Sequence, residues 1–203
     1  MARSEKVNQQ MKEERKERIQ EEALKLFAIQ GLSATKISHI AKATGMSQGL
    51  MYHYYDAKES IYIDLIKIAY DRMEKASIQL LAMEGTALEK INLVIDQMYD
   101  GIQNNIKYGY QFLLLSHASV NIAIPEEAKK IIATKGKVHY KAVEEILIQG
   151  QKEGTLKDFL PEDLALLFWT SINGLAINRA IQGDSFKAPN KEIILNMIFK
   201  LRV

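Results

Sequence analysis

The chain has 203 residues, of which 47% are hydrophobic, so it is long enough for one large domain or two small ones with a buried core. Its net charge of +2 predicts no partner by itself. The chain contains no cysteine, which excludes disulfide bonds, thiol catalysis and zinc sites built on cysteine. The charged N-terminus is unlike a secretory signal, and no apolar run approaches the length of a membrane span. We therefore expect a cytoplasmic protein that does not enter a membrane.

Helices are expected throughout, because only 3 prolines and 11 glycines interrupt a chain rich in Ile, Leu, Ala, Lys and Glu. No strand-like alternation and no internal repeat stands out. We therefore expect an all-α fold of about nine helices, preceded by a frayed segment over residues 1–10. The predicted helices cover residues 11–30, 35–44, 47–54, 56–83, 86–105, 107–120, 125–153, 161–182 and 190–201.

Capping and turn residues mark the boundaries of the second, third and fourth helices. Thr35 is placed to cap the second helix, and Ser47 is placed to cap the third. Between them, Gly45 supplies the backbone freedom that a tight turn needs. Asp56 and Glu59 have the spacing of a capping box and open the fourth helix.

Two short helices joined by a glycine turn make a helix-turn-helix unit. In such a unit the second helix presents its N-terminal residues to base edges, while the first helix crosses the DNA backbone. In the second helix here, Leu50, Met51 and Tyr54 have the spacing to pack on neighbouring helices. The outer side then carries Ser47, Gln48, Gly49, Tyr52 and His53.

These residue types suit contact with DNA. Gln48 can pair with adenine, and Tyr52 can donate to a phosphate or pack on a thymine methyl group. Lys58 can reach a phosphate as a point charge, and residues 23–55 contain no Asp or Glu. An ordinary helical hairpin with a solvated polar face is the alternative, but the coincidence of cap, glycine turn, exposed aromatics and lysine favours DNA binding. The predicted DNA contacts are Thr35, Lys36, Ser47, Gln48, Gly49, Tyr52, His53 and Lys58.

At these residues the chain resembles the TetR family of bacterial transcription regulators, over about residues 15–65. The residues in register with the family pattern are Phe27, Gly31, Thr35, Ile40, Ala41, Gly45, Ser47, Gly49, Tyr52, Tyr54 and Lys58. The chain has Ser38 where the family often has Arg, which removes one expected phosphate contact. The resemblance implies a DNA-binding domain over residues 1–58. It also implies a helical domain over residues 59–203 that dimerises and encloses a ligand.

Two C-terminal segments are candidates for a dimer interface. Residues 168–181 carry apolar or small side chains nearly all round the helix, which is typical of burial on more than one side. The last helix adds a second apolar face, so four helices could meet at the interface, two from each subunit. The alternative is the core of a monomer. The predicted interface residues are Leu164, Phe168, Ile172, Leu175, Ile194, Met197, Ile198 and Leu201.

Aromatic and amide side chains in the C-terminal part suit a mid-sized, mostly apolar ligand. Aromatics at helical spacing are more often core residues, so core packing is the alternative for each of them. His117 and His139 lack metal-ligand spacing with carboxylates, and we expect neither a metal nor a cofactor. The predicted ligand contacts are Tyr70, Met73, Tyr99, Tyr108, Phe112, His117, Asn121, Trp169 and Asn173.

Three functions compete. The favoured one is a homodimeric repressor that binds double-stranded DNA at an inverted repeat and is released by a small-molecule effector. The second is a regulator of the same fold that a protein partner controls. A buried cavity would favour the first, and a filled core with an exposed apolar patch would favour the second. An enzyme is disfavoured, because the chain has no HExxH motif, no phosphate loop and no glycine-flanked serine with a matching histidine and carboxylate.

Overall fold

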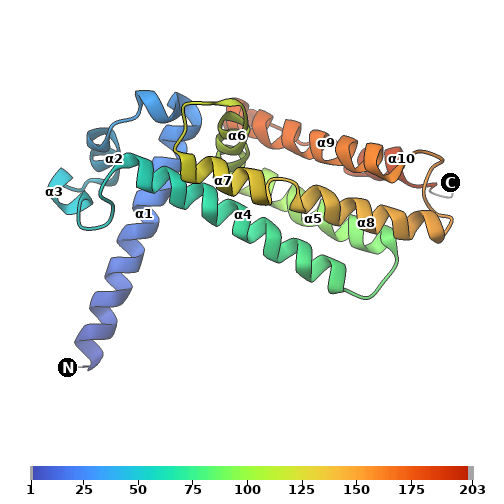
Figure 1. The fold of residues 1–203 in the computed structure, drawn as a ribbon, viewed down its shortest axis with the longest axis horizontal. Coiled ribbons are helices and arrows are strands. Elements are labelled where there is room, and N and C mark those ends of the chain that lie inside the picture. Colours follow the sequence, from blue (N-terminus) through green and yellow to red (C-terminus); the bar gives the residue numbers. More distant parts are fainter. Residues whose placement is uncertain (1, 201–203) are drawn as a thin grey trace.

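The computed structural model describes residues 2–200, with side chains from residue 6 onward. Over this range the chain forms ten α-helices and one short 3₁₀ turn (Figure 1). The helices are α1 Ala2–Ala34, α2 Ile37–Thr44, α3 Gln48–Met51, α4 Lys58–Ala82, α5 Ala87–Asn104, α6 Ile106–Val120, α7 Glu126–Lys135, α8 Val138–Lys152, α9 Pro161–Gln182 and α10 Glu192–Ile198, and the 3₁₀ turn is η1 Gly183–Ser185.

The predicted all-α architecture is confirmed, and several predicted boundaries are wrong. The single helix predicted over residues 125–153 is two helices, because the backbone breaks between α7 and α8 at Gly136 and Lys137. The segment expected to fray is helical from Ala2 onward, because α1 begins there. Helix α10 is shorter than predicted because Phe199 leaves the helix to bridge with Leu156.

The N-terminal core forms where α1, α2, α3 and the first half of α4 meet. Gly31 interrupts α1 with φ 78°, which lets the chain turn toward α2. Phe27 of α1 packs edge-on against Tyr62 of α4, with ring centroids 5.4 Å apart. This core is continuous with Leu114 of α6 and Ala128 of α7. The helices that carry the predicted DNA contacts are therefore packed directly on the remainder of the chain.

The C-terminal core lies among α5, α6, α8, α9 and α10, and in Figure 1 all of these except α6 run along the length of the body. Its largest fully buried side chains include Phe168 of α9 and Phe199 after α10. Helices α6 and α9 pack closely because α6 has Gly109 at their crossing. Met73 of α4 packs against both cores, so α4 is shared between them.

Helix α9 is also the one segment among residues 2–200 that is long and apolar enough, by length and composition alone, to cross a membrane. Its Leu164, Phe168, Trp169, Ile172 and Ala176 are buried by the chain's own helices. The core helix of a globular protein passes the same test, and we interpret α9 in that way.

The crossing of α6 and α9 gives a stability prediction. A Cβ atom added at Gly109 would lie 2.7 Å from the carbonyl oxygen of Ala176, closer than two such atoms can approach. We expect Gly109→Ala to lower the free energy of unfolding by about 1–3 kcal/mol, measured by denaturant unfolding. Gly174→Ala on α9 is the control, because nothing lies within 4 Å of its added Cβ. Equal effects of the two substitutions would contradict this account.

Candidate DNA-binding surface and effector cavity

The turn between α2 and α3 has the geometry of a helix-turn-helix. Gly45 ends α2 in the left-handed region with φ 68°, and its N–H donates to the carbonyl oxygen of Lys42. Ser47 then caps α3, where its hydroxyl oxygen accepts from the backbone N–H of Leu50 at 3.2 Å. Met51 is fully buried and anchors α3 on the N-terminal core. These contacts fix which side of α3 faces outward.

That outward side carries the residues predicted for base and phosphate contact. Ser47, Gln48, Gly49 and His53 are exposed, and the side chain of Tyr52 is 54% exposed. Lys36, at the start of α2, is also exposed. A polar, aromatic and acid-free surface of this kind suits a major groove, and these six residues remain predicted DNA contacts.

Thr35 is placed differently from its prediction. Its side chain is fully buried, and its hydroxyl donates to the carbonyl oxygen of Gly31 at 2.8 Å. The cap position of α2 belongs to Lys36, which makes no side-chain cap. Thr35 therefore satisfies a backbone group at the break in α1, and its side chain is not available to a phosphate.

Lys58 is also occupied by backbone groups. Its Nζ donates to the carbonyl oxygens of Leu32 at 2.7 Å, Thr35 at 2.8 Å and Ser33 at 3.3 Å. Carbonyl groups at a helix C-terminus have no intrahelical donor, and an ammonium group supplies one. Lys58 thus fastens the start of α4 to the end of α1, and a phosphate contact would require it to release these groups.

This arrangement predicts different outcomes for two lysines. We expect Lys58→Met to lower the free energy of unfolding by about 1 kcal/mol, because the carbonyl groups at the end of α1 lose their shared donor. We expect Lys36→Met to keep that stability and to reduce the slope of log DNA affinity against log salt by about one. If Lys58→Met instead keeps its stability and reduces the slope of log DNA affinity against log salt by about one, the result would support the predicted phosphate contact of Lys58.

A polar network joins the end of the recognition unit to α1 and α4. The Tyr55 hydroxyl donates to Asp64 Oδ2 at 2.6 Å, and Gln20 Nε2 donates to the same carboxylate at 3.0 Å. Lys16 Nζ lies 3.1 Å from this carboxylate. Burial alone would raise the pKa of Asp64, but the hydrogen bonds from Tyr55 and Lys16 hold that pKa below its usual value. The carboxylate is therefore charged at neutral pH and holds the network together.

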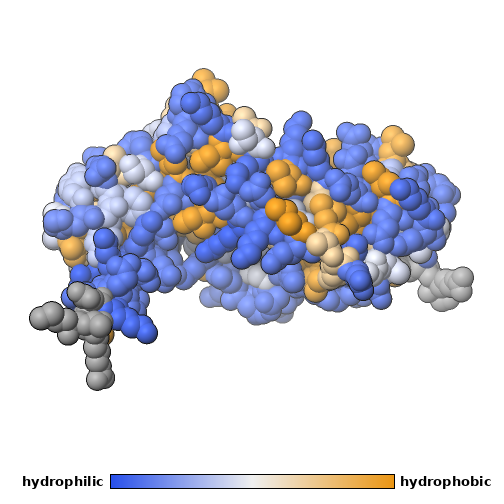
Figure 2. Space-filling view, turned by 60° about the horizontal axis from the view of Figure 1, so that its bottom comes forward, coloured by the Kyte–Doolittle hydropathy of each residue, from blue (hydrophilic) through white to orange (hydrophobic). Residues whose placement is uncertain are grey.

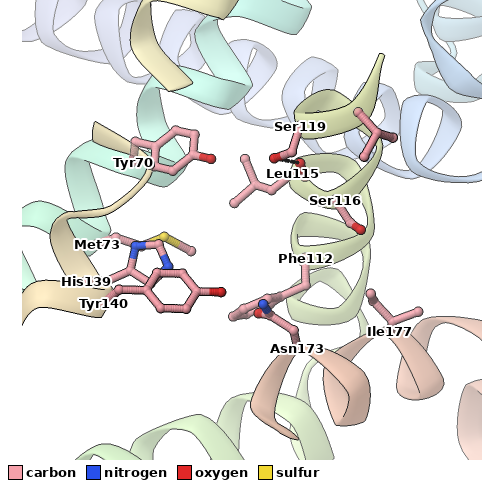
Figure 3. A pocket seen from close by; sticks show the side chains of 12 residues that line it. Tyr70, Met73, Phe112, Leu115, Ser116, Ser119, His139, Tyr140, Asn173 and Ile177 are labelled. Carbon is pink, nitrogen blue, oxygen red and sulfur yellow. Dashed lines mark hydrogen bonds between the residues drawn. The ribbon is translucent and has the colours of Figure 1, made fainter. Parts of the chain in front are cut away.

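A cavity of about 280 Å³, here called the inner chamber, lies in the C-terminal part of the chain (Figure 3). Helices α4, α6, α8 and α9 and the α7–α8 junction contribute its walls. Figure 3 shows side chains from the four helices approaching one space. Its lining residues are Tyr70, Met73, Phe112, Leu115, Ser116, Ser119, Val120, Gly136, His139, Tyr140, Asn173 and Ile177.

A second cavity of about 520 Å³, the outer chamber, lies between α1 and the C-terminal helices. Met73 and Phe112 line both chambers, so these two side chains stand between them. The outer chamber has charged groups in its wall, including Arg72 and the ion pair of Lys107 with Glu21. Gln20, a member of the network at Asp64, also lines it. The outer chamber therefore borders α1, which packs on α2.

The structure separates the predicted ligand contacts into three groups. Tyr70, Met73, Phe112 and Asn173 line the inner chamber, and Tyr108 and Trp169 line only the outer one. Tyr99 is a core residue, while His117 and Asn121 are exposed, and none of these three lines either chamber.

Sequence reasoning missed His139 and Tyr140 as lining residues. Their helix was predicted to be continuous with the preceding one, so the direction of its faces could not be assigned. His139 lies four residues before the buried Val143, and this spacing was the available sign that it faces inward.

His139 is the most buried polar group of the inner chamber, with 9% of its surface exposed. The centroid of its ring lies 4.6 Å from that of Tyr140 and 4.7 Å from that of Trp169. The Nε1 atom of Trp169 donates to the His139 carbonyl oxygen. Within the described residues, the Nδ1 atom of His139 is buried without a hydrogen-bond partner. Burial lowers the pKa of His139 from 6.5 to about 4, so the ring is neutral at neutral pH.

This shift predicts a dependence of stability on pH. The unfolded chain takes up a proton at His139 near pH 6.5, whereas the folded chain takes it up only near pH 4. Stability contributed by the neutral ring is thus complete above pH 6.5 and is lost as the pH falls toward 4, by about 3 kcal/mol in total. We expect this loss in urea unfolding of the unsubstituted protein and its absence in His139→Phe. Parallel pH profiles of the two proteins would contradict the prediction.

The predicted dimer contacts are mostly core residues of the single chain. Leu164, Phe168, Ile172, Ile194 and Ile198 are at most 5% exposed, because the inward sides of α9 and α10 pack against the chain's own helices. These five side chains cannot also form an interface. Leu175 is half-buried, Met197 is 37% exposed, and Leu201 lies outside the described residues.

The outward sides of the same two helices are also apolar. Leu166 and Leu167 of α9 are 57% and 39% exposed, and Ile193 of α10 is 53% exposed. Both helices therefore carry apolar side chains on two sides, one buried within the chain and one exposed.

Comparisons with known proteins agree with this geometry. The family model for bacterial regulatory proteins of the tetR family matches residues 19–65, which include all of α2 and α3. The transcriptional repressor KstR2 of Mycolicibacterium smegmatis is 25% identical in an alignment of 171 residues, and the alignment covers 78% of each chain. Residues 19–65 therefore match the TetR family, as the sequence resemblance implied, and most of the chain is similar to transcription regulators rather than to enzymes.

Solved structures share the whole fold. The MbdR regulator from Azoarcus sp. CIB has a TM-score of 0.78 at 23% identity, over 93% of this chain and 100% of that chain. AibR, in complex with isovaleryl coenzyme A and operator DNA, has a TM-score of 0.69 at 17% identity, over 90% of this chain and 95% of that chain. The arrangement of N-terminal and C-terminal helices is thus that of known regulators.

Proposed function

We propose that the chain is a ligand-responsive repressor that binds an inverted-repeat operator as a homodimer and is released by a small, mostly apolar molecule. The carrying observation is the course of α4. This helix begins three residues after Tyr55 at the end of the recognition unit, and it supplies Tyr70 and Met73 to the inner chamber. A pocket between the helices, beside the two cores, favours control by a small molecule over control by a protein partner.

The proposed mechanism is a shift between two arrangements of the DNA-binding helices. An effector releases the operator only if it binds the DNA-incompetent arrangement more tightly than the competent one. Asp64 holds Tyr55 to α4, so a tilt of α4 would carry α3 with it. In a dimer this tilt would change the distance between two recognition helices, which must fit successive major-groove faces.

We further propose a functional division at residue 58. Residues 1–58 would bind DNA, with Lys36, Ser47, Gln48, Gly49, Tyr52 and His53 at the groove, and residues 59–203 would bind the effector and dimerise. The relatives support the two activities in their names: KstR2 is a repressor, and the AibR structure contains both operator DNA and isovaleryl coenzyme A. A protein of this kind works in the cytoplasm, where the chromosome is accessible.

The test is selection of binding sites from a pool of random duplexes, followed by affinity measurements across salt. We expect an inverted repeat to be enriched, with an affinity that falls steeply as salt rises. We expect Gln48→Ala to weaken binding to the selected site by about 1–3 kcal/mol, because a base contact is lost. Gln79→Ala, at an exposed position on α4, is the matched control. Equal binding to all duplexes would refute the proposed operator recognition.

The proposed dimer has its own test. Its interface would use the exposed side of α9 and α10, where Leu166, Leu167, Ile193 and Met197 lie, because a symmetric pair would cover these apolar side chains. We expect Leu167→Glu to convert the dimer to a monomer in sedimentation equilibrium and to weaken operator binding. Leu93→Glu on α5 is the control, since Leu93 is 38% exposed and Leu167 is 39% exposed. A Leu167→Glu protein that remains dimeric would exclude this face.

A further inference from the structure

The inner chamber differs from the outer chamber in charge. No Asp, Glu, Lys or Arg lines the inner chamber, whose polar groups are hydroxyls, the Asn173 amide and the His139 imidazole. The wall of the outer chamber contains two acids and two bases, Glu17, Glu21, Arg72 and Lys107. A charged ligand group would therefore meet no counter-ion in the wall of the inner chamber.

The polar groups of the inner chamber lie at its two sides. Figure 3 shows Tyr140 and His139 from α8 facing Phe112 of α6 and Asn173 of α9 across the space. Met73, Leu115, Val120 and Ile177 add apolar side chains to the wall, which is thus part polar and part apolar. The wall thus accepts an apolar body and can bond a polar group at one end.

His139 points to a ligand more strongly than the other residues do. It is more than nine-tenths buried, lines the chamber, and has an Nδ1 atom without a hydrogen-bond partner within the described residues. Buried polar groups in folded proteins are nearly always hydrogen-bonded, and a partner can be supplied by a bound molecule. The neutral imidazole has one donating and one accepting nitrogen, so it can bond a hydroxyl or carbonyl group of a ligand.

We propose that the effector is an uncharged molecule with an apolar body and a hydroxyl or carbonyl group that hydrogen-bonds the His139 side chain, and that the inner chamber excludes carboxylates. The inference rests on the proposed function, because it names the chemistry of the molecule that would release the operator. Burial that keeps His139 neutral at neutral pH is consistent with it, since an imidazolium ring would attract an anion.

The test uses 2-naphthol and 2-naphthoate, which have the same ring system and differ in charge at neutral pH. Binding to the full-length protein without DNA is measured by the ligand-dependent rise in melting temperature. We expect 2-naphthol to bind at least tenfold more tightly than 2-naphthoate. We expect His139→Phe to reduce the affinity for 2-naphthol about tenfold, the effect of one lost hydrogen bond, and to leave 2-naphthoate weak.

Controls separate the ligand chemistry from folding and from operator release. His117→Phe should change neither affinity, because His117 is exposed on α6 and lines neither chamber. Circular dichroism and operator binding without ligand establish that His139→Phe is folded. If folding fails, Asn173→Leu provides a second removal of a polar group from the chamber, with the same expected loss for 2-naphthol.

The possible outcomes distinguish the two proposals. Equal or tighter binding of 2-naphthoate, or no binding of either molecule, would overturn the assigned ligand chemistry. An unchanged affinity of His139→Phe for 2-naphthol would overturn the role of His139. Binding of 2-naphthol that leaves operator affinity unchanged would instead count against the proposed release mechanism, while a protein that recognises no operator would refute the proposed function itself.

Discussion

The packing of α4 against both cores is the constraint on which the rest of the structure depends. Its first half, with Ile61 and Tyr62, completes the core beneath the recognition unit, and Met73 further along contacts both cores. Lys58 at its start donates to the carbonyl groups at the end of α1, and Asp64, nearly two turns later, accepts a hydrogen bond from Tyr55. In the proposed mechanism a tilt of α4 would act on α1 and on Tyr55 through these bonds, while the same helix forms a wall of the inner chamber.

The N-terminal half of the fold was predictable because its determinants are local. Gly45, Ser47 and the apolar spacing of Met51 and Tyr54 act within a few residues, and the structure has the turn, the cap and the core-facing side as expected, although Leu50 is only partly buried. Thr35 does not cap α2 as predicted, and Lys58 is engaged by backbone groups, because both residues bond carbonyl groups exposed by the break in α1. Such partners depend on tertiary geometry that spacing along a helix does not contain.

The C-terminal half was less predictable, because aromatic residues at helical spacing serve cores, cavities and interfaces alike. Tyr70 and Tyr99 look equivalent in sequence and both are buried core residues, yet only Tyr70 also lines the inner chamber. Phe168 and Leu167 are neighbours on α9, and the direction of the helix alone decides that the first is buried and the second exposed. Assigning such residues requires knowing which helices are adjacent. Because the break at Gly136 was not predicted, the neighbours of α8 could not be predicted either.

The close crossing at Gly109 determines which helices are free to move. Because the backbones of α6 and α9 are in contact there, neither can slide past the other without a clash. Helix α6 also holds α1, through the ion pair of Lys107 with Glu21 among other contacts. The N-terminal helices thus contact the pair of α6 and α9 through α1, and they contact α4 at a second place. In the proposed mechanism, α1 keeps its contact with α6 while α4 tilts. A small change in the inner chamber would then rotate the recognition helix about that contact.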